Sequence, residues 1–126
     1  MGRAQQEKII VLVVEDDPMQ RMMAVDIVEE AGFTAIEAAN ADEAVLILEM
    51  RDDIRIMFTD IDMPGTMDGL LLASVVRDRW PPIEIIITSG KEGGSELQLP
   101  ERSVFFPKPY DPEHLCSTLA DFGESH

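Results

Sequence analysis

The chain has 126 residues and a mass of 14.0 kDa, enough for the core of one ordinary domain and too little for a second. With 10 basic and 25 acidic residues its formal net charge is -15, which disfavours direct binding to nucleic acid or to an anionic membrane surface. The single cysteine, Cys116, excludes an intrachain disulfide. Because the sequence also lacks the long apolar run of a membrane span or secretory signal, we expect a cytoplasmic protein.

The first half of the chain predicts two strands, each followed by a helix. Residues 9–14 form a continuous apolar run rich in β-branched side chains, as in strands buried on both faces of a parallel sheet. Residues 18–31 begin with proline and carry apolar side chains at helical spacing. Residues 34–38 are a weaker strand candidate. Asn40 then caps a helix over residues 41–51.

The second half repeats this alternation. Apolar runs predict strands over residues 54–59, 83–89 and 104–106. A helix over residues 69–80 is ended by two prolines, and the last helix begins after Asp111 and extends to about residue 122.

Alternating strands and helices predict an open parallel sheet with helices on both faces, in a single domain over residues 1–126 with its core at about 8–122. One connection differs from the others. Residues 90–102 hold three glycines and a proline, so any helix there is short, one or two turns around residues 95–99.

Polar residues follow the predicted strands directly. Ligands of open parallel sheets bind beyond the carboxyl ends of the strands, where these side chains would converge. They are Glu15, Asp16 and Asp17 after the first strand, Asp60 after the third, Thr88, Ser89 and Gly90 after the fourth, and Lys108 after the fifth.

Several carboxylates brought together require a cation, and magnesium suits them because it prefers oxygen ligands and uses few carboxylates. Asp60 is the best-placed nucleophile, since a carboxylate at such a site can attack a phosphoryl donor to give an acyl phosphate. Asp17 is either a third ligand or, as we favour, a solvent-facing residue at the positive end of the first helix. Asp68 is likewise interpreted not as a ligand but as the residue at which the third predicted helix begins.

Four motifs in order, VLVVEDDP, FTDIDMPGTMDG, ITSG and FFPKPY, resemble the receiver domain of bacterial response regulators over almost the whole chain. The resemblance implies a flavodoxin-like fold with five parallel strands in the order 2-1-3-4-5. It also implies a phosphoacceptor switch, which we expect to be a stand-alone receiver, rather than a conventional enzyme. The phosphoryl donor would be a histidine kinase or histidine phosphotransfer protein, and a downstream effector protein would recognise the changed surface.

The resemblance also implies roles for individual residues. Asp60 would be the phosphoacceptor, Asp16 a direct magnesium ligand, and Glu15 an acid that acts on the metal chiefly through water. Asp62 would supply its backbone carbonyl. Lys108 would be the active-site lysine, followed by a bond to proline that is often cis in this family. No organic cofactor is expected.

Thr88 and Ser89 both offer a hydroxyl at the end of the fourth predicted strand. Aligning the preceding residues with the family favours Ser89 as the switch hydroxyl and leaves Thr88 as the alternative. Phe105 would be the aromatic switch partner, without the hydroxyl of the tyrosine often found there.

Two other functions fit less well. Asp60 and Asp62 form a DxD pair of the kind used by magnesium-dependent phosphatases with an aspartyl-phosphate intermediate, but the chain has no length for a substrate-covering cap. A flavin carrier would need a phosphate-binding loop after the first strand, where EDDP would repel phosphate.

Overall fold

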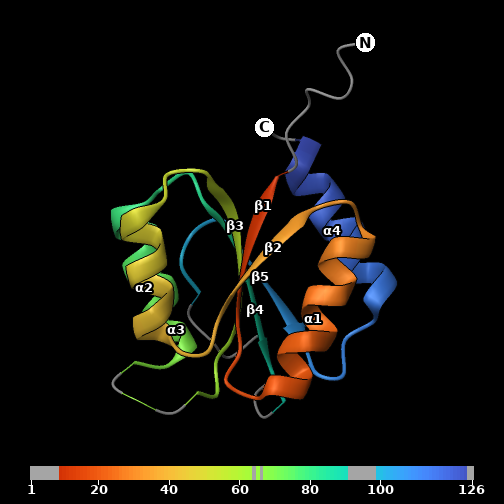
Figure 1. Cartoon of the computed structure of the whole chain (residues 1–126), viewed down its shortest axis with the longest axis horizontal. Coiled ribbons are helices and arrows are strands. Elements are labelled where there is room, and N and C mark those ends of the chain that lie inside the picture. The colour runs from red at the N-terminus through yellow and green to blue at the C-terminus, as the bar shows by residue number, and fades with distance from the viewer. Residues whose placement is uncertain (1–8, 64, 66, 91–98, 125–126) are drawn as a thin grey trace.

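The protein was analysed as a computed structural model, which describes residues 9–63, 65, 67–90 and 99–124. Five parallel strands form one sheet in the order β2-β1-β3-β4-β5 (Figure 1), as predicted. The strands are β1 (Ile10–Val14), β2 (Thr34–Ala38), β3 (Ile54–Asp60), β4 (Glu84–Ser89) and β5 (Ser103–Pro107). The flavodoxin-like arrangement is therefore confirmed.

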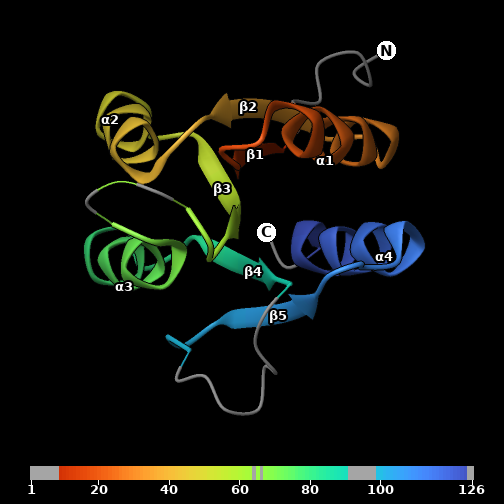
Figure 2. The same cartoon turned by 90° about the horizontal axis from the view of Figure 1, so that it is seen from below.

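Four helices cover the sheet within the described residues. They are α1 (Pro18–Glu30), α2 (Ala41–Met50), α3 (Gly69–Arg79) and α4 (Pro112–Glu124). Figure 2 shows α1 and α4 on one face and α2 and α3 on the other, so the sheet is the middle of three layers. The short helix predicted around residues 95–99 falls outside the described part of the chain, apart from Leu99. No helix among the described residues is long and apolar enough to span a bilayer.

Each of the four described helices begins at a side chain that accepts a hydrogen bond from the first turn. At α4 this is Asp111, which accepts from the amide of Glu113 at 3.0 Å. Asp17 accepts from the amides of Met19 and Gln20 at the start of α1. Asn40 and Asp68 cap α2 and α3 in the same way. These caps satisfy backbone donors that lack a partner inside the helix, and they fix where each helix leaves the sheet edge. The predictions that Asp17 lies at the start of α1 and Asp68 at the start of α3 are thus confirmed.

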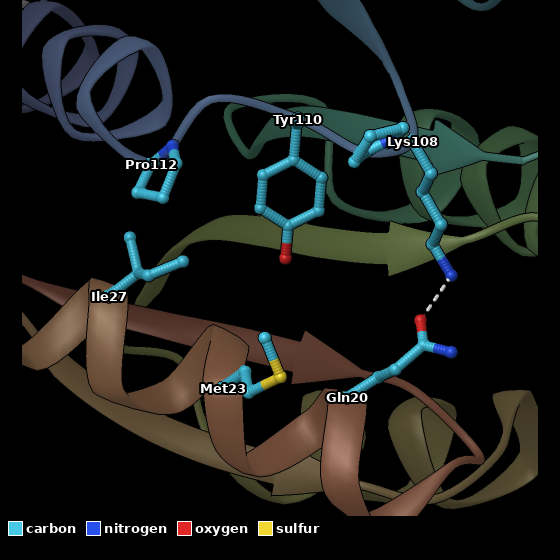
Figure 3. Close-up of a pocket in the computed structure, with 7 residues that line it drawn as sticks. Gln20, Met23, Ile27, Lys108, Tyr110 and Pro112 are labelled. Atoms are coloured by element: carbon cyan, nitrogen blue, oxygen red, sulfur yellow. Dashed lines mark hydrogen bonds between the residues drawn. The ribbon is translucent and has the colours of Figure 1, made fainter.

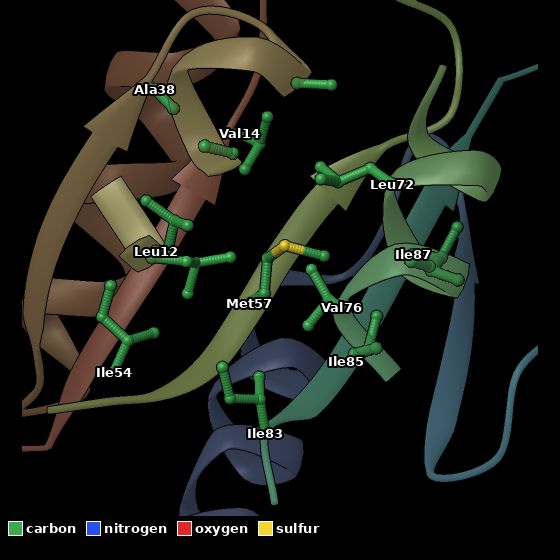
Figure 4. Packing of buried hydrophobic residues seen from close by; sticks show 14 of the residues in the cluster. Leu12, Val14, Ala38, Ile54, Met57, Leu72, Val76, Ile83, Ile85 and Ile87 are labelled. Carbon is green, nitrogen blue, oxygen red and sulfur yellow. The ribbon is translucent and has the colours of Figure 1, made fainter. Parts of the chain in front are cut away.

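The core has two halves because successive side chains of a strand point to opposite faces of the sheet. Leu12, Met57 and Ile85 face α2 and α3 and belong to the cluster drawn in Figure 4. Val11 and Ile86 face α1 and α4 in the second cluster. Burial on both faces explains why the strands read as continuous apolar runs.

The strand register brings the chemistry-bearing residues to one edge. Asp60, the last residue of β3, pairs with Thr88 of β4, and Ser89 pairs with Pro107 of β5. Since all strands are parallel, their carboxyl ends lie together, and Lys108 follows directly after β5.

Candidate functional site

Three carboxylates meet at the carboxyl edge of the sheet. Glu15, Asp16 and Asp60 each place one oxygen so that all three oxygens lie within 4.8 Å of one another. Glu15 and Asp60 are buried, at 6% and 4% exposure. This trio of hard oxygen donors suits magnesium or calcium, and a bound cation would relieve the mutual repulsion of the carboxylates.

Glu15 is the carboxylate most affected by its surroundings. Burial raises its pKa to about 7, and the charges of Asp60 and Asp16 act in the same direction. The backbone amide of Asp17, 3.1 Å from Glu15 Oε2, and the ammonium of Lys108 partly oppose this rise in the pKa. A substantial fraction of Glu15 is therefore protonated near neutral pH when no cation is bound.

Lys108 supplies positive charge to the same edge. Its Nζ lies 3.1 Å from Asp60 Oδ2, 3.6 Å from Glu15 Oε1 and 2.6 Å from Gln20 Oε1. The backbone amide of Lys108 donates to Ser89 O at 2.9 Å, which fixes the residue just beyond the sheet. Burial lowers the pKa of Lys108, but Asp60 and Glu15 together raise it above its usual value. The bond from Lys108 to Pro109 is cis, as the resemblance implied.

The two candidate hydroxyls have different partners. Thr88 Oγ1 donates to the backbone oxygen of Phe106 at 2.7 Å, so it links β4 to β5. Ser89 Oγ donates to Asp62 Oδ2 at 2.8 Å and lies at the edge of the carboxylate site. This difference favours Ser89 over Thr88 as the hydroxyl that could reach a group on Asp60, although the assignment of the switch role stays a prediction.

Asp62 contacts the site through two groups. Its backbone amide donates to Asp60 Oδ1 at 3.2 Å, while its carboxylate accepts from Ser89. Among the described residues, the Asp62 carboxylate is not part of the close acidic trio. A metal-binding role for its backbone carbonyl remains a prediction.

Gly69 allows the backbone to pack directly against Asp60. A Cβ atom at this position would lie 2.0 Å from the backbone oxygen of Asp60. The amide of Gly69 also donates to Ile61 O at 3.0 Å. Only glycine fits this approach without displacing the end of β3.

Gln20 and Tyr110 also lie at the site and were not predicted from the sequence. Gln20 lies in the first turn of α1, three residues after the cap Asp17. Tyr110 packs edge-on against Phe58 with ring centroids 5.6 Å apart. Burial, and then the nearby charges of Glu15 and Asp60, raise the pKa of Tyr110.

Phe105, predicted as the aromatic switch partner, is partly buried in β5 and packs against the core cluster beneath α2 and α3. Its neighbour Phe106 faces the other layer, near Tyr110 and His114. The structure thus places the side chain of Phe105 in the same layer as α3, away from the layer of Tyr110.

A largely apolar cavity of about 340 Å³ lies between α1 and the segment leading into α4 (Figure 3). Its lining comprises Gln20, Met23, Ile27, Lys108, Pro109, Tyr110 and Pro112. The hydrogen bond between Lys108 and Gln20 lies at one end of the group of lining residues.

Comparison with known proteins gives one consistent family. A sequence model described as the response regulator receiver domain matches residues 11–120. Sensor kinase CckA of Brucella abortus is 35% identical over 118 residues, which cover 90% of this chain and 12% of that protein. The hydrogenase transcriptional regulatory protein HoxA of Cupriavidus necator is 28% identical over 117 residues, 90% of this chain and 24% of that protein. The chain therefore spans a quarter or less of the length of these curated relatives.

A solved structure shows the same arrangement of elements. The response regulator receiver protein from Pseudomonas putida superposes with a TM-score of 0.79 at 28% identity, covering 92% of this chain and 98% of that one.

Proposed function

The chain belongs to the response regulator receiver domain family, and on this basis we propose that it is a phosphoacceptor switch of a two-component system. Asp60 accepts the phosphoryl group, and the donor is a histidine kinase or a histidine phosphotransfer protein. The observation that carries the proposal is the position of the Asp60 carboxylate, buried between two acidic neighbours and the ammonium of Lys108. We propose a single receiver domain over residues 1–126, with its core at about 8–122.

The transfer itself is a displacement at phosphorus. One carboxylate oxygen of Asp60 forms a bond to phosphorus while the bond from phosphorus to the donor imidazole nitrogen breaks. The electron pair of the broken bond stays on the imidazole, which takes a proton from solvent. Asp60 Oδ1 accepts from the amide of Asp62 and Oδ2 accepts from Lys108, so both oxygens are held before the donor arrives.

Magnesium fits the residues of the site. Asp16 and Asp60 would bind it directly, Glu15 would act chiefly through water, and the backbone carbonyl of Asp62 would complete the protein ligands. Bound there, the ion would neutralise charge on the phosphoryl oxygens. The ammonium of Lys108, 3.1 Å from Asp60 Oδ2, provides a second positive charge at the site.

Ser89 is the residue that responds to the phosphoryl group. In the absence of phosphate its hydroxyl donates to Asp62. On phosphorylation the hydroxyl turns to a phosphoryl oxygen, which moves the end of β4 and shifts the population of surface conformations that an effector protein recognises. We place this signalling in the cytoplasm, where a cytoplasmic kinase domain would supply the phosphoryl group.

Binding of beryllofluoride tests this function. This anion imitates a phosphoryl group on an aspartate, and ¹⁹F NMR distinguishes bound from free fluoride. We expect a bound signal with magnesium in the native protein and none in Asp60→Asn. Asp52→Asn is the matched control, because Asp52 is an exposed aspartate preceding β3 at the opposite edge of the sheet. Binding that survives in Asp60→Asn would contradict the proposal, as would sustained hydrolysis of a small phosphate ester, which would favour the phosphatase.

A further inference from the structure

A chain of hydrogen bonds connects the cap of α1 to Asp60. Asp17 accepts from Gln20 Nε2 at 3.3 Å, Gln20 Oε1 accepts from Lys108 Nζ at 2.6 Å, and Lys108 Nζ donates to Asp60 Oδ2 at 3.1 Å. We propose that Gln20 is a positioning residue that holds the ammonium of Lys108 in place for phosphoryl transfer to Asp60. This inference rests on the proposed function. Gln20 lies outside the four motifs that resemble the receiver family.

The chemistry of the two neighbours fixes the orientation of the Gln20 amide. An ammonium can only donate hydrogen bonds, so the amide oxygen must face Lys108. A carboxylate can only accept, so the amide nitrogen must face Asp17. Each end of the amide therefore has a partner of the required kind, and the reverse orientation would lose both bonds.

Asp17 is itself held by the start of the helix. Its Oδ1 accepts from the amide of Met19 at 2.9 Å, which leaves Oδ2 for the Gln20 side chain. The backbone amide of Asp17 in turn donates to Glu15 Oε2 at 3.1 Å. The Gln20 oxygen that accepts from Lys108 is thus held, through Asp17, by the first turn of α1 and by the end of β1.

Lys108 needs such an anchor because its side chain has four rotatable bonds and is 22% exposed. Its ammonium donates to Asp60 and Gln20 and forms an ion pair with Glu15. The two carboxylates belong to the trio that a cation or a phosphoryl group would engage. Gln20 is neutral and lies outside that trio, so its oxygen remains available to Lys108 when the charge on the carboxylates is neutralised.

Kinetics with a small phosphodonor provide the first test. Phosphoramidate with magnesium would be titrated against the native protein and against Gln20→Met, which keeps the shape of the side chain and removes the acceptor. Because misplacing a catalytic group weakens only the reacting state, we expect the maximal rate to fall by about tenfold with little change in half-saturation. Gln20→Glu keeps an oxygen for Lys108 but loses the donor that faces Asp17, so it should recover part of the rate.

Met22→Gln is the matched control. Met22 is 57% exposed on the same helix, so exchanging the same two residue types there should leave the rate unchanged. Both variants lose the bond to Asp17, and only Gln20→Glu keeps an oxygen for Lys108. An equal loss in Gln20→Met and Gln20→Glu would therefore overturn the proposal, because the acceptor for Lys108 would make no difference. An unchanged or increased rate in Gln20→Met would also overturn it.

A second measurement does not depend on phosphorylation. The sequence holds three lysines, so the side-chain ¹⁵N signals are few, and Lys108→Arg identifies that of Lys108. We expect the Lys108 ammonium to exchange with water several-fold faster in Gln20→Met than in the native protein or in Gln20→Glu. Identical exchange in all three would refute the positioning role even if Asp60 is phosphorylated. Failure of phosphorylation in the native protein would contradict the proposed function. The exchange rate of the Lys108 ammonium would still test whether Gln20 holds Lys108.

Discussion

Replacing Glu15 with glutamine should make the metal-free protein more stable at alkaline pH. Glu15 is 6% exposed and its pKa is raised from 4.5 to about 7, chiefly by burial. Its charged form is therefore less stable in the folded protein than in the unfolded chain. Glutamine has nearly the same shape and carries no charge, so the variant removes this penalty.

The sign and size follow from proton linkage. Between the unfolded pKa of 4.5 and the folded pKa of about 7, the folded protein holds a proton on Glu15 that the unfolded chain has released. The free energy of unfolding therefore falls as the pH rises through this range, and it stays lower above pH 7. The pKa difference corresponds to about 3 kcal/mol, or roughly 10 °C in the midpoint of thermal unfolding for a domain of this size.

Urea denaturation with a chelator present, at several pH values between about 4.5 and 8, measures the effect. We expect the native protein and Glu15→Gln to be similarly stable at the acidic end and to diverge with rising pH in favour of the variant. Glu29→Gln, at an exposed position on α1, controls for the loss of one negative charge. Parallel pH profiles for the native protein and Glu15→Gln would refute the raised pKa.

Three further substitutions test the packing around the site and its hydrogen bonds. Gly69→Ala places a methyl group against the backbone of Asp60 and should cost about 1–3 kcal/mol in urea denaturation; unchanged stability would argue against the close approach. Leu119→Ala, in a fully buried position of α4, should cost about 2–5 kcal/mol without changing the slope, and a smaller loss would contradict the packing of α4 on the sheet. Asp62→Ala removes the acceptor that competes for Ser89, so beryllofluoride should bind about tenfold more tightly; weaker binding would show that the Asp62–Ser89 bond does not oppose the switch.

The elements themselves could be predicted because their signals are local. The apolar runs of β1 and β4 need no knowledge of their neighbours, and Asp17 and Asp68 cap helices that begin immediately after them. The predicted limits differ from the observed ones by a few residues at most. For example, the strand predicted over residues 104–106 extends to Ser103–Pro107 because it pairs along the length of β4.

The contacts within the site depend on how distant segments meet, so the sequence could not reveal them. Lys108 and Gln20 are 88 positions apart, and nothing near either residue indicates the other. The Ser89–Asp62 bond likewise spans 27 positions. The raised pKa of Glu15 follows from burial at the sheet edge, which a count of acidic residues does not show. Sequence pattern thus predicted which groups gather, and the structure adds which atoms pair.

Identification of the phosphorylated residue tests the central claim most directly. The protein would be treated with phosphoramidate and magnesium, reduced with borohydride to convert an acyl phosphate to an alcohol, digested and analysed by mass spectrometry. We expect homoserine at position 60 and at no other aspartate. Reduction at a different carboxylate, or no reduction in the native protein, would contradict the proposal that Asp60 is the phosphoacceptor.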